Sequence, residues 1–253
     1  MFIANKFPEK DEAIIENAKN NIRLINPKKI VLISTVAVYD RTVDVDEDYR
    51  PDVNSLTPYG KNRLALEDWV EQNYEQHLII RLPAIFGENL KKNFIYDFIN
   101  FIPPMLTEEK YGDYSSRDAL IKNSYYSLDN GFYKLKDIDD ATKKALKGSF
   151  EAIGFSALNF TDSQSVYQFF WLKNLYGFIT DCLSKGISKI NLVTPPVSIS
   201  ELYNYLTGKP FNNITGKTPF NYNIKTKHFK DGYVMTKDEE LLQIKEFVAS
   251  KLD

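Results

Sequence analysis

The stretch Ile30-Val31-Leu32-Ile33-Ser34-Thr35 decides the predicted fold of this chain. An apolar run that ends in two hydroxyl residues is typical of a buried parallel strand whose carboxyl end carries polar groups. The run follows Asn26-Pro27, which ends a helix predicted for residues 10 to 25 from apolar residues at helical spacing. We therefore expect a helix and then a strand, over residues 29 to 34, near the start of the sequence.

A second informative stretch, Tyr59-Gly60-Lys61-Asn62-Arg63, opens the next predicted helix. Pro58 precedes it, and proline fits the first turn of a helix because its missing N–H group needs no partner there. Tyr59 and Arg63 lie one turn apart, on one face of this helix. A strand over residues 78 to 82 follows. Strand, helix and strand in close succession form a βαβ unit, which predicts a parallel sheet.

The remaining sequence has weaker patterns, which predict a second, smaller part of mixed helices and strands. Asn130-Gly131 favours the positive φ angles of a tight hairpin turn. Two capping boxes, Ser198 to Glu201 and Thr236 to Glu239, predict the starts of the last two helices. The other expected elements are a helix over 94–102, a hairpin over 121–136 around Asp129-Asn130-Gly131, a helix over 139–152, an amphipathic helix from about 172 that ends at Gly186, and a strand over 187–193.

The composition excludes several classes of protein. The sequence has 253 residues, of which 43% are hydrophobic, so the protein can bury a sizeable core. Its formal net charge is −2 and it has no long basic run, which argues against a nucleic-acid or anionic-membrane surface. No apolar stretch reaches membrane-spanning length, and the polar, acidic N-terminus does not resemble a signal peptide. We therefore expect a soluble, cytoplasmic protein.

Neither a disulfide framework nor a metal site is expected. Cys182 is the single cysteine of the sequence. Asp44, Asp46 and Asp48 are spaced like the first ligands of a calcium loop, but Tyr49 stands where that loop needs glycine. A solvated acidic loop is therefore the preferred interpretation.

Together, the strand end and the Tyr59 helix resemble the extended short-chain dehydrogenase/reductase family of nucleotide-sugar epimerases, dehydratases and reductases. The resemblance covers about residues 30–95 and includes the segment Arg81 to Gly87. In that family a serine or threonine orients the substrate oxygen, a tyrosine is the acid/base, and a lysine assists the tyrosine and holds the cofactor ribose. The resemblance implies that the catalytic residues of this chain are Thr35, Tyr59 and Arg63.

Arg63 departs from the lysine of the family. A guanidinium keeps the positive charge that favours a tyrosine anion, but it is larger and planar and is effectively never deprotonated. Lys61 cannot replace it, because a residue two positions after Tyr59 points away from Tyr59 on a helix. The alternative is an ordinary helix that carries an exposed arginine and a tyrosine packed under a loop.

The resemblance implies NAD or NADP as the cofactor. On this interpretation Phe2-Ile3-Ala4-Asn5 is the tail of the family's fourth strand, and the segment after the second predicted strand faces the nicotinamide. The residues that the resemblance then assigns to cofactor binding are Ala4, Ser34, Tyr59, Arg63, Pro83, Ala84 and Ile85.

The glycine-rich turn with which the family holds the cofactor pyrophosphate has no counterpart in this sequence. Gly60 is the first glycine, and by comparison with the family two βαβ units of about 30 residues each are absent before it. Two explanations stay open: the sequence starts within a longer natural protein, or the chain is a naturally shortened family member. The absence of these units leaves an unpaired edge on what is normally the middle of the sheet. We expect another chain, the N-terminal segment or a local rearrangement to cover this edge, so a homo-oligomer through the edge is an expected partner.

The same resemblance implies a carbohydrate or nucleotide-sugar substrate, held by Thr35, Asn93, Tyr167 and Gln168. Asn93 is also consistent with a helix cap. Tyr167 or Gln168 stands where family members usually place a diphosphate-binding arginine, and a neutral residue binds a diphosphate poorly. Val36-Ala37 replaces the acidic pair of the 4,6-dehydratases, and neither side chain can move a proton. Dehydration is therefore disfavoured, and epimerisation or simple oxidation and reduction remains.

The predicted fold is α/β: a partial Rossmann-like parallel sheet with flanking helices, plus a smaller α+β substrate lobe. Residues 1–92, with about 160–195, are predicted to form the truncated core, and residues 93–160 and 196–253 the substrate-binding lobe. The predicted function is an NAD(P)-dependent oxidoreductase or epimerase that acts on a nucleotide sugar or related carbohydrate. The alternative is a catalytically inactive relative that serves as a binding or scaffold protein.

Overall fold

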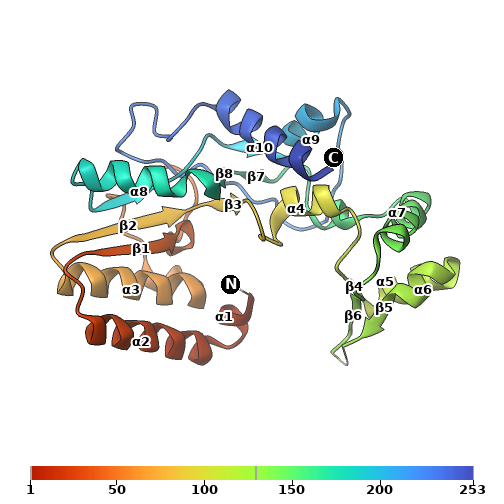
Figure 1. Cartoon of the computed structure of the whole chain (residues 1–253), viewed down its shortest axis with the longest axis horizontal. Helices are drawn as coiled ribbons and strands as arrows, with labels where there is room; N and C mark the ends of the chain where they lie inside the picture. Colours follow the sequence, from red (N-terminus) through yellow and green to blue (C-terminus); the bar gives the residue numbers. More distant parts are fainter. Residues whose placement is uncertain (1, 129, 253) are drawn as a thin grey trace.

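A parallel three-stranded sheet forms the centre of the molecule in the computed structural model, which describes residues 2–128 and 130–252. Its strands are β1 (Ile30–Thr35), β2 (His77–Leu82) and β9 (Lys189–Asn191), in the order β1-β2-β9. Helix α3 (Pro58–Asn73) covers one face of this sheet and α8 (Leu175–Ser184) covers the other (Figure 1). The predicted α/β fold, in which helices flank a parallel sheet, is confirmed.

The succession of α2 (Pro8–Ile25), β1, α3 and β2 agrees with the predicted pattern to within a few residues. α2 ends at Asn26, which adopts the left-handed conformation with a φ angle of 45°. Thr57 caps α3, because its side chain accepts a hydrogen bond from the Gly60 N–H group. One apolar cluster joins the three elements and contains Ile15 of α2, Ile30 of β1, and Leu66 and Val70 of α3.

The N-terminal segment is helical, so the prediction that Phe2 to Asn5 form the end of a strand is wrong. The short helix α1 (Phe2–Lys6) lies beside the start of α3, where the Asn5 side chain accepts a hydrogen bond from the Tyr59 N–H group at 3.0 Å. A helix satisfies its own backbone groups, whereas a strand needs a neighbouring strand. Ala4, predicted to bind the cofactor, is therefore buried on a helix.

The outer edge of β1 has no strand partner within residues 2–128 and 130–252. The N-terminal segment does not cover this edge by strand pairing, because α1 is a helix. No local rearrangement in this part of the chain adds a strand there either. Of the three expected kinds of cover, another chain is the one that stays a prediction.

A second apolar core lies beside the sheet, where three helices pack on short strands. The strands are β3 (Ala84–Phe86), parallel to β8 (Phe169–Trp171), and β7 (Val166–Tyr167), antiparallel to β10 (Val197–Ser198). The helices are α4 (Asn93–Asn100), α9 (Ile199–Thr207) and α10 (Lys237–Leu252). α9 and α10 begin at the predicted caps: Ser198 accepts a hydrogen bond from Glu201 N–H, and Thr236 from Glu239 N–H.

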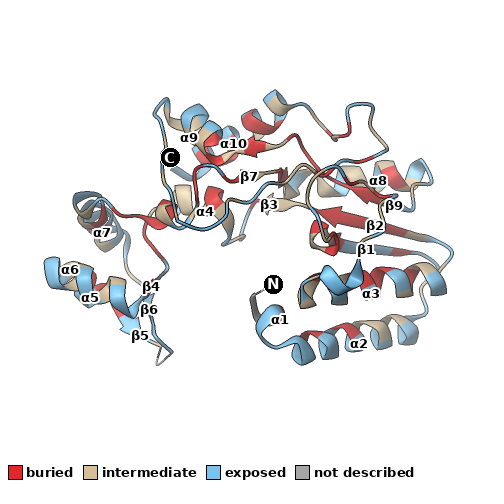
Figure 2. Ribbon diagram, turned by 180° about the vertical axis from the view of Figure 1, so that it is seen from behind, coloured by how far each residue is buried: buried red, intermediate tan, exposed pale blue. Residues whose placement is uncertain are grey.

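A small lobe formed by residues 105–153 stands apart from the parallel sheet (Figures 1 and 2). Its hairpin agrees with the one predicted over residues 121–136, although Asp129 of the predicted turn lies outside the described residues. Residues 119–124 are helical instead of extended, because Asp118 caps them by accepting hydrogen bonds from Leu120 and Ile121 N–H groups. The elements of the lobe are β4 (Met105–Thr107), α5 (Glu108–Arg117), α6 (Ala119–Ser124), β5 (Tyr125–Ser127), β6 (Phe132–Leu135) and α7 (Asp140–Ile153).

Short 3-10 helices make several of the connections: η1 (Val36–Val38), η2 (Val53–Ser55), η3 (Ala157–Phe160) and η4 (Leu172–Asn174). η4 occupies the first residues of the amphipathic helix predicted from about 172, so α8 begins three residues later. In the described chain no helix combines the length and the apolar composition that crossing a membrane requires.

Candidate functional site

A cavity of about 240 Å³, named here the Thr35 pocket, lies at the carboxyl ends of β1 and β2. Ligands commonly bind at this end of parallel sheets. Five of the predicted site residues line it together: Thr35, Pro83, Ala84, Tyr167 and Gln168. The other lining residues are Val36, Ala37, Phe220 and Tyr222. None of these side chains is charged, so the pocket suits an uncharged part of a ligand.

A tight turn holds Thr35 at the wall of this pocket. β1 ends at Thr35, whose Oγ1 accepts a hydrogen bond from the Ala37 N–H group at 3.1 Å and so starts η1. The start of α3 presses against the same turn, since a Cβ atom on Gly60 would lie 2.1 Å from the Ala37 carbonyl oxygen. Only a residue without a side chain allows this approach, and the approach places Tyr59 beside the turn.

Tyr59 and Arg63 lie together on α3, as predicted for one face of a helix. The Arg63 guanidinium lies over the Tyr59 ring, 4.7 Å from its centroid. The same guanidinium donates through Nη2 to Asp11 of α2 at 3.0 Å, and Asn62 donates to the other oxygen of Asp11 at 3.0 Å. Its second nitrogen, Nη1, is buried without a hydrogen-bond partner. Arg63 is therefore paired with a buried carboxylate and still has one unsatisfied donor.

Three aromatic rings form one wall of the Thr35 pocket. Tyr167 and Tyr222 are stacked with ring centroids 5.9 Å apart, and Phe220 lies 5.7 Å from Tyr167. The segment that carries Phe220 and Tyr222 is fixed by two backbone hydrogen bonds to Val166 of β7. Burial raises the pKa of Tyr167 to about 12, so its hydroxyl stays protonated at neutral pH. The wall can therefore stack on an apolar ring face and offer a neutral hydroxyl.

Gln168 is buried beneath this wall, and its polar atoms are occupied by the main chain. Its Nε2 group donates to the carbonyl oxygens of Thr194 at 2.6 Å and Ile224 at 2.8 Å. Its Oε1 atom accepts from the Ile224 N–H group at 2.9 Å. These bonds hold the chain just after Tyr222 in place. Gln168 therefore positions the aromatic wall, whereas the sequence predicted a direct contact with substrate.

Ser34 lies in a different environment, on the face of the sheet that α3 covers. Its hydroxyl donates to Glu67 Oε1 at 2.5 Å, and Glu67 Oε2 accepts from Arg81 Nη2 at 2.6 Å. Arg81 Nη1 donates to the Tyr39 hydroxyl at 2.7 Å. Burial would lower the pKa of Arg81, but the hydrogen bonds and charge of Glu67 outweigh it and raise that pKa. Burial raises the pKa of Tyr39 to about 12, so this network holds one ion pair and a neutral phenol.

One other predicted ligand contact, Asn93, has structural partners. The Asn93 side chain donates to the Ile85 carbonyl oxygen at 2.8 Å and accepts from the Ile95 N–H group at 3.0 Å. It therefore ties the middle of β3 to the first turn of α4, in which Asn93 is the first residue, while Lys92 at the N-cap makes no side-chain cap bond. The other predicted site residues do not line the Thr35 pocket: Ala4, Ser34, Tyr59, Arg63, Ile85 and Asn93.

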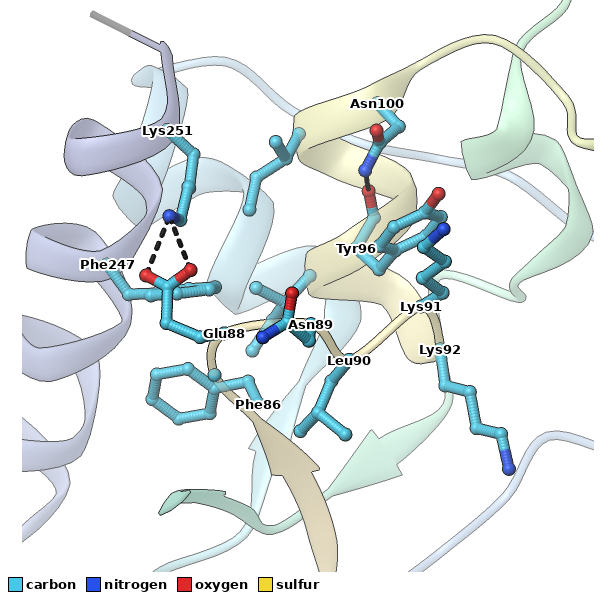
Figure 3. A pocket seen from close by; sticks show the side chains of 13 residues that line it. Phe86, Glu88, Asn89, Leu90, Lys91, Lys92, Tyr96, Asn100, Phe247 and Lys251 are labelled. Atoms are coloured by element: carbon cyan, nitrogen blue, oxygen red, sulfur yellow. Dashed lines mark hydrogen bonds and ion pairs between the residues drawn. The ribbon is translucent and has the colours of Figure 1, made fainter. Parts of the chain in front are cut away.

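A second cavity of about 300 Å³ lies between α4, α10 and the loop that follows β3 (Figure 3). Lys251 of α10 reaches across to Glu88 of the loop at 2.6 Å, and the rings of Phe86 and Phe247 lie beside this ion pair. Tyr96 and Asn100 line the α4 side. No predicted site residue lines this cavity, so the Thr35 pocket is the candidate functional site.

The residues that sequence reasoning missed are Phe220, Tyr222 and Asp11. Phe220 and Tyr222 come from an irregular segment more than 50 positions after Tyr167, so no local pattern connects them to the pocket. Asp11 is an ordinary acidic residue in the first turn of α2. In the described chain no group of three or more His, Cys, Asp or Glu side chains is arranged to hold a metal ion.

The sequence was compared with models of known protein families, and one of them matches. Residues 9–103 match the family model of the RmlD substrate binding domain. The matched region runs from α2 to the residues after α4, and it includes Thr35, Tyr59, Arg63 and Asn93. No curated protein sequence matches the chain.

Similar solved structures include an epimerase and a dehydratase of nucleotide sugars. UDP-N-acetylglucosamine 4-epimerase from Methanobrevibacter ruminantium M1, in complex with UDP-N-acetylmuramic acid, is 15% identical over 93% of this chain and 66% of its own, with a TM-score of 0.52. RMD from Pseudomonas aeruginosa, complexed with NADPH, is 14% identical over 98% and 75%, with a TM-score of 0.52. dTDP-glucose 4,6-dehydratase from Bacillus anthracis str. Ames, in complex with NAD, is 13% identical over 98% and 69%, with a TM-score of 0.53.

The chain spans about two thirds of the length of the first of these structures, and the low identities support a common fold alone. The predicted resemblance is confirmed at that level. The chain has the fold of the extended short-chain dehydrogenase/reductases, and over residues 9–103 it matches the family model of the RmlD substrate binding domain.

Proposed function

We propose that this chain acts on a nucleotide sugar or a related carbohydrate, as an NAD(P)-dependent oxidoreductase or epimerase. The observation that carries the proposal is the Thr35 pocket, in which residues from the ends of β1, β2 and β7 converge with an aromatic wall. A sugar ring has an apolar face that stacks on aromatic rings and hydroxyl groups that need polar partners. The fold shared with nucleotide-sugar epimerases and dehydratases supports the same class of ligand.

The size of the pocket limits which part of a nucleotide sugar it holds. Its volume of about 240 Å³ is smaller than the roughly 300–1,000 Å³ usual for pockets that enclose a whole small-molecule ligand. No lining residue is charged, so the diphosphate has no partner inside it. We therefore place only the sugar ring in the Thr35 pocket, with the diphosphate and the nucleotide outside it.

The roles of the side chains follow from their positions. Thr35 lines the pocket, and its hydroxyl would orient the reacting substrate oxygen. Tyr59 lies beside the turn that carries Thr35 and would exchange a proton with that oxygen. Arg63 lies over the Tyr59 ring and would hold that side chain in position through the cation–π contact.

The residues of the described chain fit one end of a nicotinamide dinucleotide. The buried Nη1 donor of Arg63 lacks an acceptor, and a ribose hydroxyl oxygen is an acceptor of the right kind. Tyr59, Arg63 and the segment Pro83 to Ile85 would hold the nicotinamide and its ribose, and the bound cofactor would exchange a hydride with the substrate. Two further residues cannot contribute to this fit, because the Ser34 hydroxyl is bonded to Glu67 and Gly60 packs against the Ala37 carbonyl oxygen. We therefore derive no step through the dinucleotide.

A second candidate function is ligand binding without catalysis. The observation that favours it is the ion pair of Arg63 with Asp11, which offsets the charge that would otherwise act on Tyr59. On this alternative the Thr35 pocket still binds a carbohydrate, but Tyr59 transfers no proton.

A turnover assay with UDP-N-acetylglucosamine and either NADH, NADPH, NAD or NADP tests the first candidate. Tyr59→Phe should lower turnover by at least about 100-fold without weakening the binding of the sugar nucleotide, because it removes only the exchangeable proton. Tyr176→Phe is the matched control, since Tyr176 is a tyrosine on α8 with 80% of its side chain exposed. Turnover that survives Tyr59→Phe would sink the catalytic proposal.

Calorimetric titration separates the two candidates. Binding of UDP-N-acetylglucosamine together with binding of NADH or NADPH supports the enzyme, and the turnover assay then measures its activity. Binding of the sugar nucleotide without any cofactor binding at millimolar concentration supports the non-catalytic relative. If UDP-N-acetylglucosamine, free N-acetylglucosamine and galactose all fail to bind, both candidates are wrong.

A further inference from the structure

The cavity between α4, α10 and the loop after β3, named here the Lys251 cavity, has an apolar floor (Figure 3). Its volume of about 300 Å³ lies at the lower end of the roughly 300–1,000 Å³ usual for pockets that enclose small molecules. The cavity therefore has room for a small ligand with an apolar body. The apolar lining residues come from β3, the loop, α4 and α10: Phe86, Leu90, Ile95, Ile99 and Phe247.

The charged residues around this floor are mostly cationic. Lys91, Lys92 and Lys251 line the cavity together with one acid, Glu88, so three lysines and one glutamate give a net charge of +2. The whole chain has a net charge of −2, so this is a local excess of positive charge on an acidic protein. A concave site lined by one sign of charge concentrates ligands of the opposite sign. The charge of the lining therefore favours an anion.

Several hydrogen-bond donors at the cavity are available to a ligand. Within residues 2–128 and 130–252, neither Lys91 nor Lys92 has a hydrogen-bond or ion-pair partner, and the Tyr96 hydroxyl has no hydrogen-bond partner. Burial raises the pKa of Tyr96, so its hydroxyl stays protonated at neutral pH and can donate. Figure 3 shows Lys91 and Tyr96 on the side of the cavity opposite Lys251. A carboxylate accepts hydrogen bonds from an ammonium and a hydroxyl alike.

The ion pair of Lys251 shows that a carboxylate fits at the cavity. The two carboxylate oxygens of Glu88 lie 2.6 and 2.8 Å from Lys251 Nζ, beside the ring of Phe247 (Figure 3). The Glu88 side chain is 70% exposed, and ion pairs this exposed add little stability. Because Glu88 can turn into water at small cost, the carboxylate of a ligand can take its place on Lys251.

We propose that the Lys251 cavity binds a small organic anion with one carboxylate and an aromatic or short aliphatic body. The body lies on the apolar floor, and the carboxylate lies among the lysines. This site is separate from the Thr35 pocket, because Ala84 at the start of β3 lines that pocket and Phe86 at the end of β3 lines the cavity. The proposal does not rest on the proposed function.

Calorimetric titration of the full chain with 2-naphthoate tests the class of ligand. Its neutral counterpart, 2-naphthamide, has the same ring system and should bind at least about 10-fold more weakly, since hydrogen bonds to a charged group are roughly twice as strong as neutral ones. Absence of 2-naphthoate binding at millimolar concentration would overturn the proposal. Equal affinities for the acid and the amide would overturn it as well.

Two substitutions with opposite expected effects test the location. Lys251→Met should weaken 2-naphthoate binding at least about 10-fold, whereas Glu88→Gln should tighten it by about 2- to 10-fold because it frees Lys251. Glu88 is a surface residue, so the second variant does not depend on the folding of the first. Circular dichroism checks that both variants are folded.

Two control variants distinguish this cavity from other sites. Lys245→Met removes another lysine of α10, one that lies over the Tyr205 ring and does not line the cavity. Thr35→Val changes the other pocket. Both should bind 2-naphthoate like the wild type. Weaker binding in either control without weaker binding in Lys251→Met, or weaker binding in Glu88→Gln, would show that the anion does not bind in the Lys251 cavity.

Discussion

Ser34 and Thr35 are adjacent in the sequence, yet they lie on opposite faces of β1 and in opposite environments. The Ser34 hydroxyl enters a buried network in which Glu67, Arg81 and Tyr39 bond one another. The Thr35 oxygen accepts a hydrogen bond from Ala37 at the end of the strand and lines a cavity. Two neighbouring residues therefore belong to different regions: Ser34 to a buried polar network and Thr35 to the candidate functional site.

The Ser34 network therefore stabilises the fold, whereas the Thr35 pocket has space for a ligand. None of the side chains in the Ser34 network has a buried polar atom without a partner, whereas Arg63, one turn earlier on α3 than Glu67, has one. A fully bonded network adds rigidity, and a buried donor without a partner can be satisfied by a ligand. Substitutions on the Ser34 side should change stability, and substitutions on the Thr35 side should change ligand binding.

The largest effect is expected on the Ser34 side, from Glu67→Gln. Arg81 would keep its charge but lose the carboxylate that compensates it at a buried position. We expect the free energy of unfolding to fall by about 3–5 kcal/mol, as for other broken buried ion pairs. Urea unfolding at neutral pH, followed by circular dichroism, measures this loss.

Glu71→Gln provides the control for that measurement. Glu71 lies one turn further along α3 and pairs with Lys189 at 2.6 Å, but both side chains are partly exposed. Loss of this pair should cost no more than about 1 kcal/mol. If the two variants lose equal stability, burial of the Ser34 network has no special importance.

On the Thr35 side, a buried carboxyl behind the pocket should make stability depend on pH. Burial raises the pKa of Glu240 to about 8 in the folded protein, against an ordinary value of 4.5. Folding therefore favours the protonated form, and this contribution is complete below about pH 4.5 and is lost as the pH rises through about 8. We expect the free energy of unfolding to fall by about 2–4 kcal/mol from pH 5 to pH 8, measured by urea unfolding.

Glu240→Gln should remove most of this pH dependence. The amide oxygen can still accept the two 2.8 Å hydrogen bonds that Glu240 Oε1 accepts from Phe169 N–H and the Thr194 hydroxyl. Burial raises the pKa of Asp97 to about 7, which acts in the same direction, so a smaller slope should remain in the variant. A wild type that is equally stable at pH 5 and pH 8 would contradict the assignment.

The elements that sequence reasoning predicted well are those whose signals are local. α3 has a proline at its first position and a threonine cap, and β1 is a short apolar run between breaks. The elements it missed depend on neighbours that the sequence does not show. Phe2 to Asn5 resemble a strand end in composition, but α1 forms because Asn5 can bond the start of α3 while no adjacent strand exists in the described chain. The predicted domain boundaries stay a prediction.

The candidate site was predictable where residues lie next to a strand or helix end. Thr35, Pro83 and Ala84 follow strands, so the parallel sheet alone brings them together. The alternation of side chains along a strand could have separated Ser34 from Thr35, since neighbours point to opposite faces. Phe220, Tyr222 and Asp11 could not be found, because only the folded chain brings them to the pocket and to Arg63. Roles in catalysis and cofactor binding stay predictions for every one of these residues.

Gly60→Ala should have a smaller effect on the free energy of unfolding. Gly60 lies at the start of α3, where that helix contacts the turn after Thr35. The added Cβ would lie 2.1 Å from the Ala37 carbonyl oxygen, so the turn or the helix start must move. We expect a loss of about 1–3 kcal/mol in the free energy of unfolding, and weaker binding of UDP-N-acetylglucosamine because the turn carries Thr35. Thermal unfolding and calorimetry measure the two effects.

Gly148→Ala is the matched glycine control. Gly148 lies inside α7, and a Cβ there would have no atom within 4 Å. Alanine in a helix is favoured over glycine by up to about 1 kcal/mol, so this variant should be slightly more stable than the wild type. Destabilisation of both variants by similar amounts would show that the close approach at Gly60 is not the cause.

The smallest effect on stability is expected from Thr35→Val. Measured together with Ser34→Ala, this variant also tests most directly whether the two faces of β1 have different roles. Thr35→Val removes the hydrogen bond to Ala37, which is worth at most about 1 kcal/mol, yet it should weaken UDP-N-acetylglucosamine binding by about tenfold. Ser34→Ala leaves Glu67 with one donor fewer inside a buried network, so it should cost about 1–3 kcal/mol and leave the affinity unchanged. Urea unfolding and calorimetry on the same samples measure both quantities. If Ser34→Ala weakens binding and Thr35→Val does not, the pocket is not the ligand site and the faces of β1 have the opposite roles.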